Sequence, residues 1–180
     1  MRSCLFLDRD GTLICEQNYL RDPSRVSLEC DVIGGLLRFQ ALGFRLVVVS
    51  NQSGVGRGLI TEDDVMAVNA RSAELLADQG VIISSWHHCP HRPDQGCSCR
   101  KPGSGLFLEA SATQSVDWPS SIMVGDKPSD VKAGLALGMK AALITTGYGS
   151  GHVAWARAHD LPVVASLTEL ADLFLPQSSI

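Results

Sequence analysis

The chain has 180 residues, a length typical of one domain, and 45% of its residues are hydrophobic. Its formal net charge of −4 gives no basic field that would attract nucleic acid or an anionic membrane surface. No apolar stretch approaches the roughly 20 residues of a membrane span, and Asp8 and Asp10 interrupt the first apolar run too early for a signal peptide. We therefore expect one domain over residues 1–180, located in the cytoplasm, with a frayed tail after Pro176 and with no nucleic-acid or membrane partner.

Short apolar runs alternate with amphipathic stretches along the whole chain. Several of the runs are rich in β-branched residues, as expected of strands that are buried on both faces of a parallel sheet. Strands are predicted at residues 3–8, 44–50, 81–86, 121–125, 140–145 and 162–165. The alternation favours an α/β fold, specifically a Rossmann-like three-layer sandwich with a mostly parallel sheet and right-handed crossovers.

The helices between these strands have recognisable ends. Thr61 and Asp64 resemble a capping box for a helix that ends near Gly80, with Asp in place of the usual Glu. The other expected helices run from a cap at Asp31 to Gly43, from Ser129 to Gly138, across residues 151–159, and from Thr168 onward.

Polar residues follow the predicted strands at the point where each strand ends. Asp8 and Asp10 follow the first strand, Ser50 ends the second, and Asp126 follows the fourth. Lys101 precedes the helix that comes after the third strand. Because the carboxyl ends of parallel strands meet at the edge where open α/β sheets bind ligands, we expect these residues to converge.

The converging side chains suit phosphoryl transfer, which requires charge neutralisation, alignment and proton movement. Asp8 can attack phosphorus, and Asp10, on the same side of the extended chain, can move protons. Asp126 can complete a Mg²⁺ site because this hard cation prefers oxygen ligands, and Lys101 supplies positive charge. Each residue alone also fits an ordinary interpretation, such as an Asp-Gly turn or a surface lysine. Their joint order at strand ends is what those interpretations leave unexplained.

Three of the six cysteines lie close together beside histidines, in a pattern typical of a metal site in a reducing compartment. The pattern is Cys89-x-His91, followed after five residues by Cys97-x-Cys99. Four such ligands suit tetrahedral Zn²⁺, and because protein fills every coordination position, the site should be structural. His87 and His88 are rival ligands that fit the Cys-x-His pairing less well. The alternative is a set of free thiols on the loop of about residues 88–101.

These residues together resemble the motifs of the haloacid dehalogenase (HAD) superfamily of aspartate-nucleophile phosphatases. The motifs stand in this chain as Asp8-Arg9-Asp10-Gly11-Thr12, Ser50, Lys101 and Gly125-Asp126-Lys127-Pro128-Ser129-Asp130. The resemblance implies that Asp8 is the nucleophile, Asp10 the general acid and base, and Ser50 and Lys101 the stabilisers of the phosphate. It also implies Mg²⁺ held by Asp8, the main-chain carbonyl of Asp10 and Asp126, which adjoins Lys127. Asp130 would orient the lysine or a metal-bound water without touching the metal.

The zinc loop, which ends in Cys-x-Cys-Arg-Lys-Pro, resembles one subgroup of this superfamily. That subgroup contains D-glycero-D-manno-heptose-1,7-bisphosphate 7-phosphatases and histidinol-phosphate phosphatases. Residues 50–58 are similar to the heptose enzymes, since histidinol-phosphate phosphatases usually carry Asp where Ser53 stands. The similarity implies substrate contacts by Glu16, Gln17, Asn18, Tyr19, Asn51, Gln52, Ser53 and Arg100.

We therefore expect a Mg²⁺-dependent phosphatase that acts through an aspartyl-phosphate on a small phosphorylated sugar. The resemblance implies removal of the 7-phosphate of D-glycero-D-manno-heptose 1,7-bisphosphate, in the supply of nucleotide-heptose for lipopolysaccharide. A second phosphate needs its own cation, which Arg100 or Arg57 can supply by bidentate contact.

The gaps after the first two strands are too short for a large cap domain, so residues 13–30 and the zinc loop should wall the site. Histidinol-phosphate phosphatase is the alternative activity. A zinc-stabilised binding module without catalysis is a further one, and the intact catalytic set argues against it. Nothing in the sequence demands a dimer, and we expect a monomer.

Overall fold

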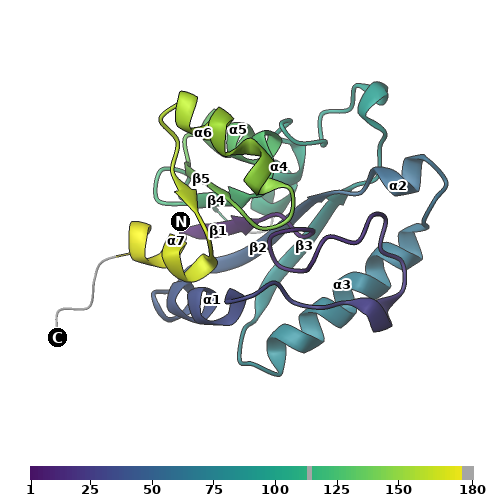
Figure 1. Cartoon of the computed structure of the whole chain (residues 1–180), viewed down its shortest axis with the longest axis horizontal. Helices are drawn as coiled ribbons and strands as arrows, with labels where there is room; N and C mark the ends of the chain where they lie inside the picture. The colour runs from purple at the N-terminus through teal and green to yellow at the C-terminus, as the bar shows by residue number, and fades with distance from the viewer. Residues whose placement is uncertain (113–114, 176–180) are drawn as a thin grey trace.

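A six-stranded parallel sheet forms the centre of the protein (Figure 1). The computed structural model describes residues 1–112 and 115–175, so the tail expected to fray after Pro176 lies outside the described residues. The sheet has the order β3-β2-β1-β4-β5-β6, and each neighbouring pair is parallel. The strands are β1 (Cys4–Leu7), β2 (Arg45–Asn51), β3 (Ile83–Cys89), β4 (Ile122–Gly125), β5 (Lys140–Ile144) and β6 (Val163–Val164).

The predicted alternation of strands and helices is confirmed, but the third strand was placed too early. It runs from Ile83 to Cys89 instead of over residues 81–86. Val81 is buried ahead of the strand and Ile82 is 61% exposed. Because β3 is an edge strand, polar side chains such as His87 and His88 are tolerated in it, and apolar content was therefore a poor guide to its extent. As a result, β3 carries Cys89 to the level of Asn51 on β2.

Helices cover both faces of the sheet. In Figure 1, α1 (Val32–Ala41), α3 (Glu62–Ala77) and α7 (Leu167–Phe174) lie on one side, and α4 (Gly105–Ala112), α5 (Pro128–Ala136) and α6 (Val153–Ala158) lie on the other. A four-residue helix, α2 (Ser53–Gly56), follows β2. Short 3-10 helices form at Pro23–Arg25, Pro93–Gln95 and Gly149–His152. The expected three-layer α/β sandwich is confirmed.

Helix caps follow the sequence in some places and depart from it in others. The Thr61–Asp64 capping box forms with both of its hydrogen bonds. Asp31 does precede α1, but its backbone is left-handed and its side chain makes no capping bond. The last helix begins at Leu167, because the hydroxyl of Ser166, and not of Thr168, accepts the N–H of Glu169. Likewise α5 begins at Pro128, one residue before the predicted Ser129.

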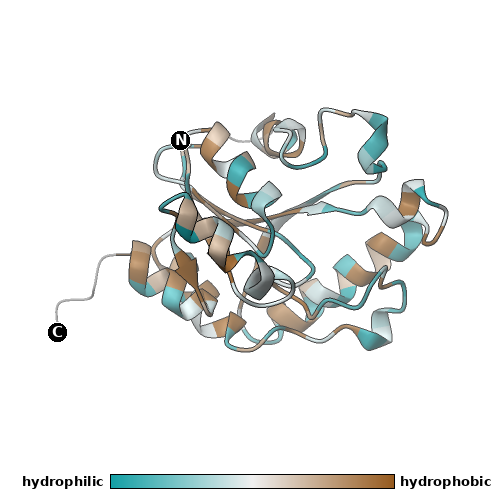
Figure 2. Ribbon diagram, turned by 45° about the horizontal axis from the view of Figure 1, so that its top comes forward, coloured by the Kyte–Doolittle hydropathy of each residue, from teal (hydrophilic) through white to brown (hydrophobic). Residues whose placement is uncertain are grey.

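The strands alternate their side chains between two hydrophobic layers. Leu5 and Leu7 of β1 pack in the layer that includes α1, α3 and α7, whereas Cys4 and Phe6 pack in the layer that includes α4, α5 and α6. Figure 2 shows the strands at the centre coloured mostly as hydrophobic. Burial on both faces therefore fixes the sheet, and the polar residues gather where the strands end. Within residues 1–112 and 115–175, no helix combines the length and apolarity that crossing a membrane requires.

Candidate active site

A pocket of about 290 Å³ opens at the carboxyl edge of the sheet. It lies where β1, β2 and β4 end, and the segments that follow β3 and β5 complete it. Its lining residues are Asp8, Arg9, Asp10, Glu16, Asn18, Tyr19, Leu20, Ser50, Asn51, Gln52, Ser53, Arg100, Lys101, Lys127, Ser129, Asp130 and Tyr148. The pocket therefore lies where we expected it, at the edge of the sheet where the carboxyl ends of the parallel strands meet.

Lys101 joins two carboxylates at the floor of this pocket. Its Nζ lies 2.9 Å from Asp8 Oδ1 and 2.8 Å from Asp130 Oδ1, and it donates to the carbonyl of Val49 at 2.6 Å. Burial alone lowers the pKa of a lysine, but here the charges of Asp130 and Asp8 outweigh it, and the pKa of Lys101 is raised. The ammonium group therefore stays charged against Asp8.

Asp10 is held by its neighbour Arg9 and by Gln52 at the end of β2. The buried guanidinium of Arg9 donates to both oxygens of Asp10, at 3.1 Å each, and to Asn69 Oδ1 of α3 at 2.9 Å. The amide of Gln52 donates to Asp10 Oδ2 at 2.7 Å and to the hydroxyl of Ser50 at 2.6 Å. The ends of β1 and β2 are therefore joined through this amide group.

Asp126 and Asp130 place two further carboxylates beside Asp8. Ligand atoms of the three residues lie within 4.8 Å of one another, and all three side chains are buried. Burial, followed by the charge of Asp8, raises the pKa of Asp126 to about 7. Asp126 Oδ2 accepts the N–H of Tyr148. Its Oδ1 accepts no hydrogen bond from the described residues and lies 3.3 Å from Lys127 Nζ. A buried, underused oxygen among clustered carboxylates fits a hard divalent cation such as Mg²⁺.

Glycine is required where two turns meet beside this carboxylate cluster. Gly11 and Gly147 both have positive φ, and a Cβ on either would come within 2.6 Å of Asp126 Oδ2. The hydroxyl of Thr146 donates to the carbonyl of Gly11 at 2.6 Å, which holds the two turns together. The turn after β5 is therefore part of the site.

The expected substrate residues divide into two groups. Glu16, Asn18, Tyr19, Asn51, Gln52, Ser53 and Arg100 line the pocket, but the lining residues do not include Gln17 or Arg57. The side-chain amide of Gln17 donates to the carbonyl of Arg25. Arg57 is exposed at the end of α2. Of the two arginines considered for a second phosphate, only Arg100 is at the pocket.

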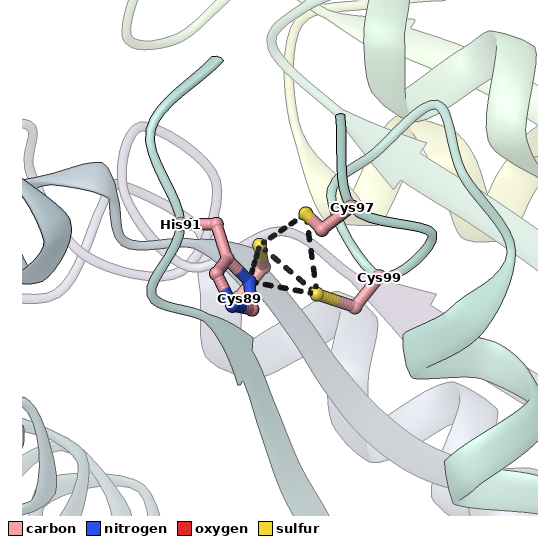
Figure 3. Close-up of side chains that lie close together, drawn as sticks. All are labelled: Cys89, His91, Cys97 and Cys99. Atoms are coloured by element: carbon pink, nitrogen blue, oxygen red, sulfur yellow. Dashed lines mark hydrogen bonds between the residues drawn. The ribbon is translucent and has the colours of Figure 1, made fainter. Parts of the chain in front are cut away.

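Cys89, His91, Cys97 and Cys99 converge in one cluster, with Cys89 at the end of β3 and the others in the following loop (Figure 3). Their Sγ and Nδ1 atoms lie 3.2 to 3.6 Å apart in the five pairs that are in contact. Zn–S bonds of about 2.3 Å place tetrahedral ligands roughly 3.7 Å apart, so the cluster fits Zn²⁺.

The three thiols of this cluster are free to bind a metal. The three cysteines form no disulfide. Burial, followed by the neighbouring Cys99, raises the pKa of Cys89 to about 12, and a bound metal is what would favour its thiolate. The rival histidines lie elsewhere, because His87 contacts Glu109 and His88 contacts Glu62. These contacts favour His91 as the histidine ligand.

The zinc loop is attached directly to the pocket. Arg100 donates to the carbonyl of His91 at 3.3 Å, and Gln52 donates its N–H to the carbonyl of Cys89 at 2.8 Å. Arg100 and Lys101 follow Cys99 in the chain, so their positions depend on the fold of this loop.

Comparison with known proteins agrees with this geometry. Residues 98–170 match the family described as HAD-hyrolase-like. A probable D-glycero-D-manno-heptose-1,7-bisphosphate 7-phosphatase of Thermoplasma volcanium is 43% identical over 123 residues, which cover 68% of this chain and 84% of the relative. A D-glycero-beta-D-manno-heptose-1,7-bisphosphate 7-phosphatase of Haemophilus influenzae is 37% identical over 154 residues, 82% of this chain and 84% of that protein. The chain belongs to the heptose-1,7-bisphosphate 7-phosphatase family of HAD-like hydrolases.

Solved structures of this heptose bisphosphatase family have the same fold. The D,D-heptose 1,7-bisphosphate phosphatase of B. bronchiseptica, complexed with magnesium and phosphate, superposes with a TM-score of 0.87 at 27% identity, over 96% of this chain and 98% of that chain. The enzyme of Burkholderia thailandensis gives a TM-score of 0.72 at 26% identity, over 98% of this chain and 100% of that chain.

Some pocket residues of this family member were not identified from the sequence. Tyr148 and Leu20 line the pocket, as do Arg9 and Ser129, which belong to the two aspartate motifs but were given no role in the site. Tyr148 could have been predicted from its position, because residues 145–149 follow the carboxyl end of β5 at the same edge of the sheet. Asp130 was expected to orient the lysine or a metal-bound water, and it pairs with Lys101 at 2.8 Å. One of its carboxylate oxygens also lies within the carboxylate cluster.

Proposed function

We propose that this protein is a Mg²⁺-dependent phosphatase that removes the 7-phosphate of D-glycero-D-manno-heptose 1,7-bisphosphate. The observation that carries the proposal is the pairing of Asp8 with Lys101 at the floor of a pocket, next to a buried cluster of carboxylates. Family membership supplies the substrate class.

Asp8 is the nucleophile of the proposed reaction. Its carboxylate oxygen attacks phosphorus, the bond between phosphorus and the sugar oxygen breaks, and Asp10 gives its proton to that oxygen. In the second step Asp10 takes a proton from water, whose oxygen attacks phosphorus, so that inorganic phosphate leaves and Asp8 is regenerated. Arg9 and Gln52 orient Asp10 for both proton transfers.

Lys101 and Ser50 lie where they can neutralise and bind the phosphate oxygens. Lys101 is already paired with Asp8, so positive charge is present where the transferred group must arrive. Asp8, Asp126 and the main-chain carbonyl of Asp10 would hold Mg²⁺. When bound, the ion supplies charge neutralisation at the phosphoryl group. Asp130 keeps Lys101 in place.

Arg100 is the proposed anchor for the 1-phosphate. It lines the pocket, its attachment to the carbonyl of His91 limits its movement, and a guanidinium suits bidentate contact with phosphate. The Cys89–His91–Cys97–Cys99 cluster would hold a structural Zn²⁺ that fixes this arginine. The loop over residues 13–30 contributes Glu16, Asn18 and Tyr19 to the pocket lining.

We also propose that the enzyme is a monomer in the cytoplasm. It would contribute to the supply of nucleotide-heptose for lipopolysaccharide. All the groups that the reaction needs come from one chain, which supports the monomer. Light scattering during size-exclusion chromatography tests the oligomeric state.

The activity is tested by phosphate release from the α and β anomers of heptose 1,7-bisphosphate and from histidinol phosphate, with and without Mg²⁺. We expect Mg²⁺-dependent turnover of a heptose bisphosphate with a kcat/KM well above that of histidinol phosphate. Both anomers belong in the panel, because similar relatives are named for the beta and the alpha substrate. Preference for histidinol phosphate would overturn the substrate, and no release from any compound would favour a binding module.

A further inference from the structure

Both tyrosines of this chain line the active-site pocket. Tyr19 belongs to the loop over residues 13–30, and Tyr148 to the turn after β5. They are 43% and 45% exposed, so both rings are accessible to a ligand. Aromatic side chains at a pocket rim provide rigid apolar walls with a polar end.

Tyr148 is fixed in place at three points. Its N–H donates to Asp126 Oδ2 at 2.8 Å, Lys127 Nζ lies 4.8 Å from the centre of its ring, and its hydroxyl donates to Asn18 Oδ1 at 3.1 Å. The backbone of Tyr148 thus rests on the carboxylate cluster, while its hydroxyl reaches the loop over residues 13–30. The ring is oriented before any substrate arrives.

The loop that receives this hydroxyl is itself held in an uncommon backbone conformation. Asn18 and Tyr19 have φ values of 41° and 54°, in the left-handed region that side-chain-bearing residues seldom adopt. Tyr19 packs on Gly54, where a Cβ would come within 2.6 Å of its Cδ1. Such a conformation persists only when surrounding contacts hold it, and the Tyr148 hydroxyl is one of those contacts.

The supports of the two rings come from different strand ends, because Tyr19 packs on Gly54. Gly54 follows β2 and Tyr148 follows β5, and β1 and β4 lie between those strands in the sheet. Both rings line the pocket that also contains Asp8, so a ligand held by its phosphate at Asp8 can extend towards them. Only a ligand with a carbon chain long enough to reach this rim gains contact with the rings.

We propose that Tyr148 is a specificity-determining residue, whose ring and hydroxyl-braced loop select extended polyhydroxylated phosphate esters over short ones. This proposal rests on the phosphatase activity proposed above. The ring covers the carbon chain between the two phosphates, and the hydroxyl keeps Asn18 and Tyr19 in their binding conformation. A two-carbon substrate such as acetyl phosphate reaches neither.

The test compares kcat/KM for heptose 1,7-bisphosphate with kcat/KM for acetyl phosphate in Tyr148→Phe and Tyr148→Ala. For Tyr148→Ala we expect the heptose value to fall about 10-fold or more, mainly through KM, and to fall at least about five-fold more than the acetyl phosphate value. Tyr148→Phe, which loses only the hydroxyl, should show a smaller loss of the same kind. Both variants keep the N–H that contacts Asp126, so their Mg²⁺ midpoints should match the wild type.

Trp155→Phe is the matched control. Trp155 lies on α6 just beyond the same turn and faces Lys132 Nζ at 5.6 Å, away from the pocket lining. In Trp155→Phe the ratio of kcat/KM for heptose 1,7-bisphosphate to kcat/KM for acetyl phosphate should stay at the wild-type value. Equal losses for both substrates in Tyr148→Ala, or no loss for either, would overturn the role of Tyr148. If the wild type does not hydrolyse heptose bisphosphate, the proposed substrate fails, and the same ratio is then taken with the best sugar phosphate of the panel.

Discussion

Asn51 and Lys101 hold each other through two hydrogen bonds. The side-chain amide of Asn51 donates to the carbonyl of Lys101 at 3.1 Å, and its Oδ1 accepts the N–H of Lys101 at 3.0 Å. The end of β2 thereby fixes the backbone of the lysine that faces Asp8. The resemblance to heptose enzymes implies a substrate contact for Asn51, which lines the pocket, and its side-chain amide also positions Lys101.

Asn51→Ala should therefore impair chemistry more than binding. Loss of both hydrogen bonds frees the Lys101 backbone, and a misplacement of about 1 Å is enough to lower kcat by about 100-fold. Steady-state kinetics should show a fall in kcat with a smaller change in KM. A rise in KM with kcat unchanged would return Asn51 to the role of a substrate contact.

Asp8→Asn should abolish turnover while the fold is kept. An amide of the same shape cannot attack phosphorus, so we expect kcat to fall by at least about 10⁴-fold. Thermal unfolding and zinc content should stay close to those of the wild type. Asp63→Asn, in the exposed first turn of α3, is the matched control and should retain full activity. Appreciable turnover by Asp8→Asn would contradict nucleophilic catalysis.

Mg²⁺ binding should weaken as the pH falls below about 7. The pKa of Asp126 in the metal-free protein is about 7, because burial and the neighbouring Asp8 disfavour its charge. Below that pH the ion must displace a proton, and its midpoint concentration should rise by up to about ten-fold per pH unit. Thermal-shift titrations between pH 5.5 and pH 8 measure this change.

The same raised pKa has a consequence for stability without the metal. Ionising Asp126 costs the folded state free energy, so this group destabilises the metal-free protein as the pH rises from its unfolded pKa towards 7. Mg²⁺ should therefore raise the melting temperature more at pH 8 than at pH 5.5. An equal shift at both pH values would contradict the role of Asp126 as a ligand. Asp126→Asn should lose most of the pH dependence.

The positions of strands could be predicted where helices cover both faces of the sheet. β1, β2, β4 and β5 are short apolar runs, and each lies at its predicted place because both faces of the strand are covered. β3 lies at the sheet edge and carries serines and histidines, so its apolar content marked the wrong residues. The Ser166 cap was missed because Ser166 and Thr168 are both competent capping residues, and tertiary packing decides between them.

The site was predictable in its catalytic part and less so in its walls. Strand ends converge by topology, so the meeting of Asp8, Ser50 and Asp126 at one edge of the sheet could be predicted from their positions, whereas their roles came from the family resemblance. Contacts between loops depend on conformations that spacing does not reveal, such as the positive φ of Asn18. For that reason Arg57 was expected at the pocket, and the Tyr148–Asn18 contact was not foreseen.

Cys97→Ser should lower the zinc content and disturb the phosphate site at a distance. A serine hydroxyl is a much poorer Zn²⁺ ligand than a thiolate, so metal analysis should show less than one zinc per chain. Because Arg100 is held by the carbonyl of His91, loosening of residues 88–101 should raise KM for the bisphosphate and speed amide exchange in the loop. Cys30→Ser, at an exposed thiol outside the cluster, is the matched control and should keep full zinc. Full zinc stoichiometry in Cys97→Ser would mean that the ligands are misassigned, and His87 and His88 would then have to be tested in turn.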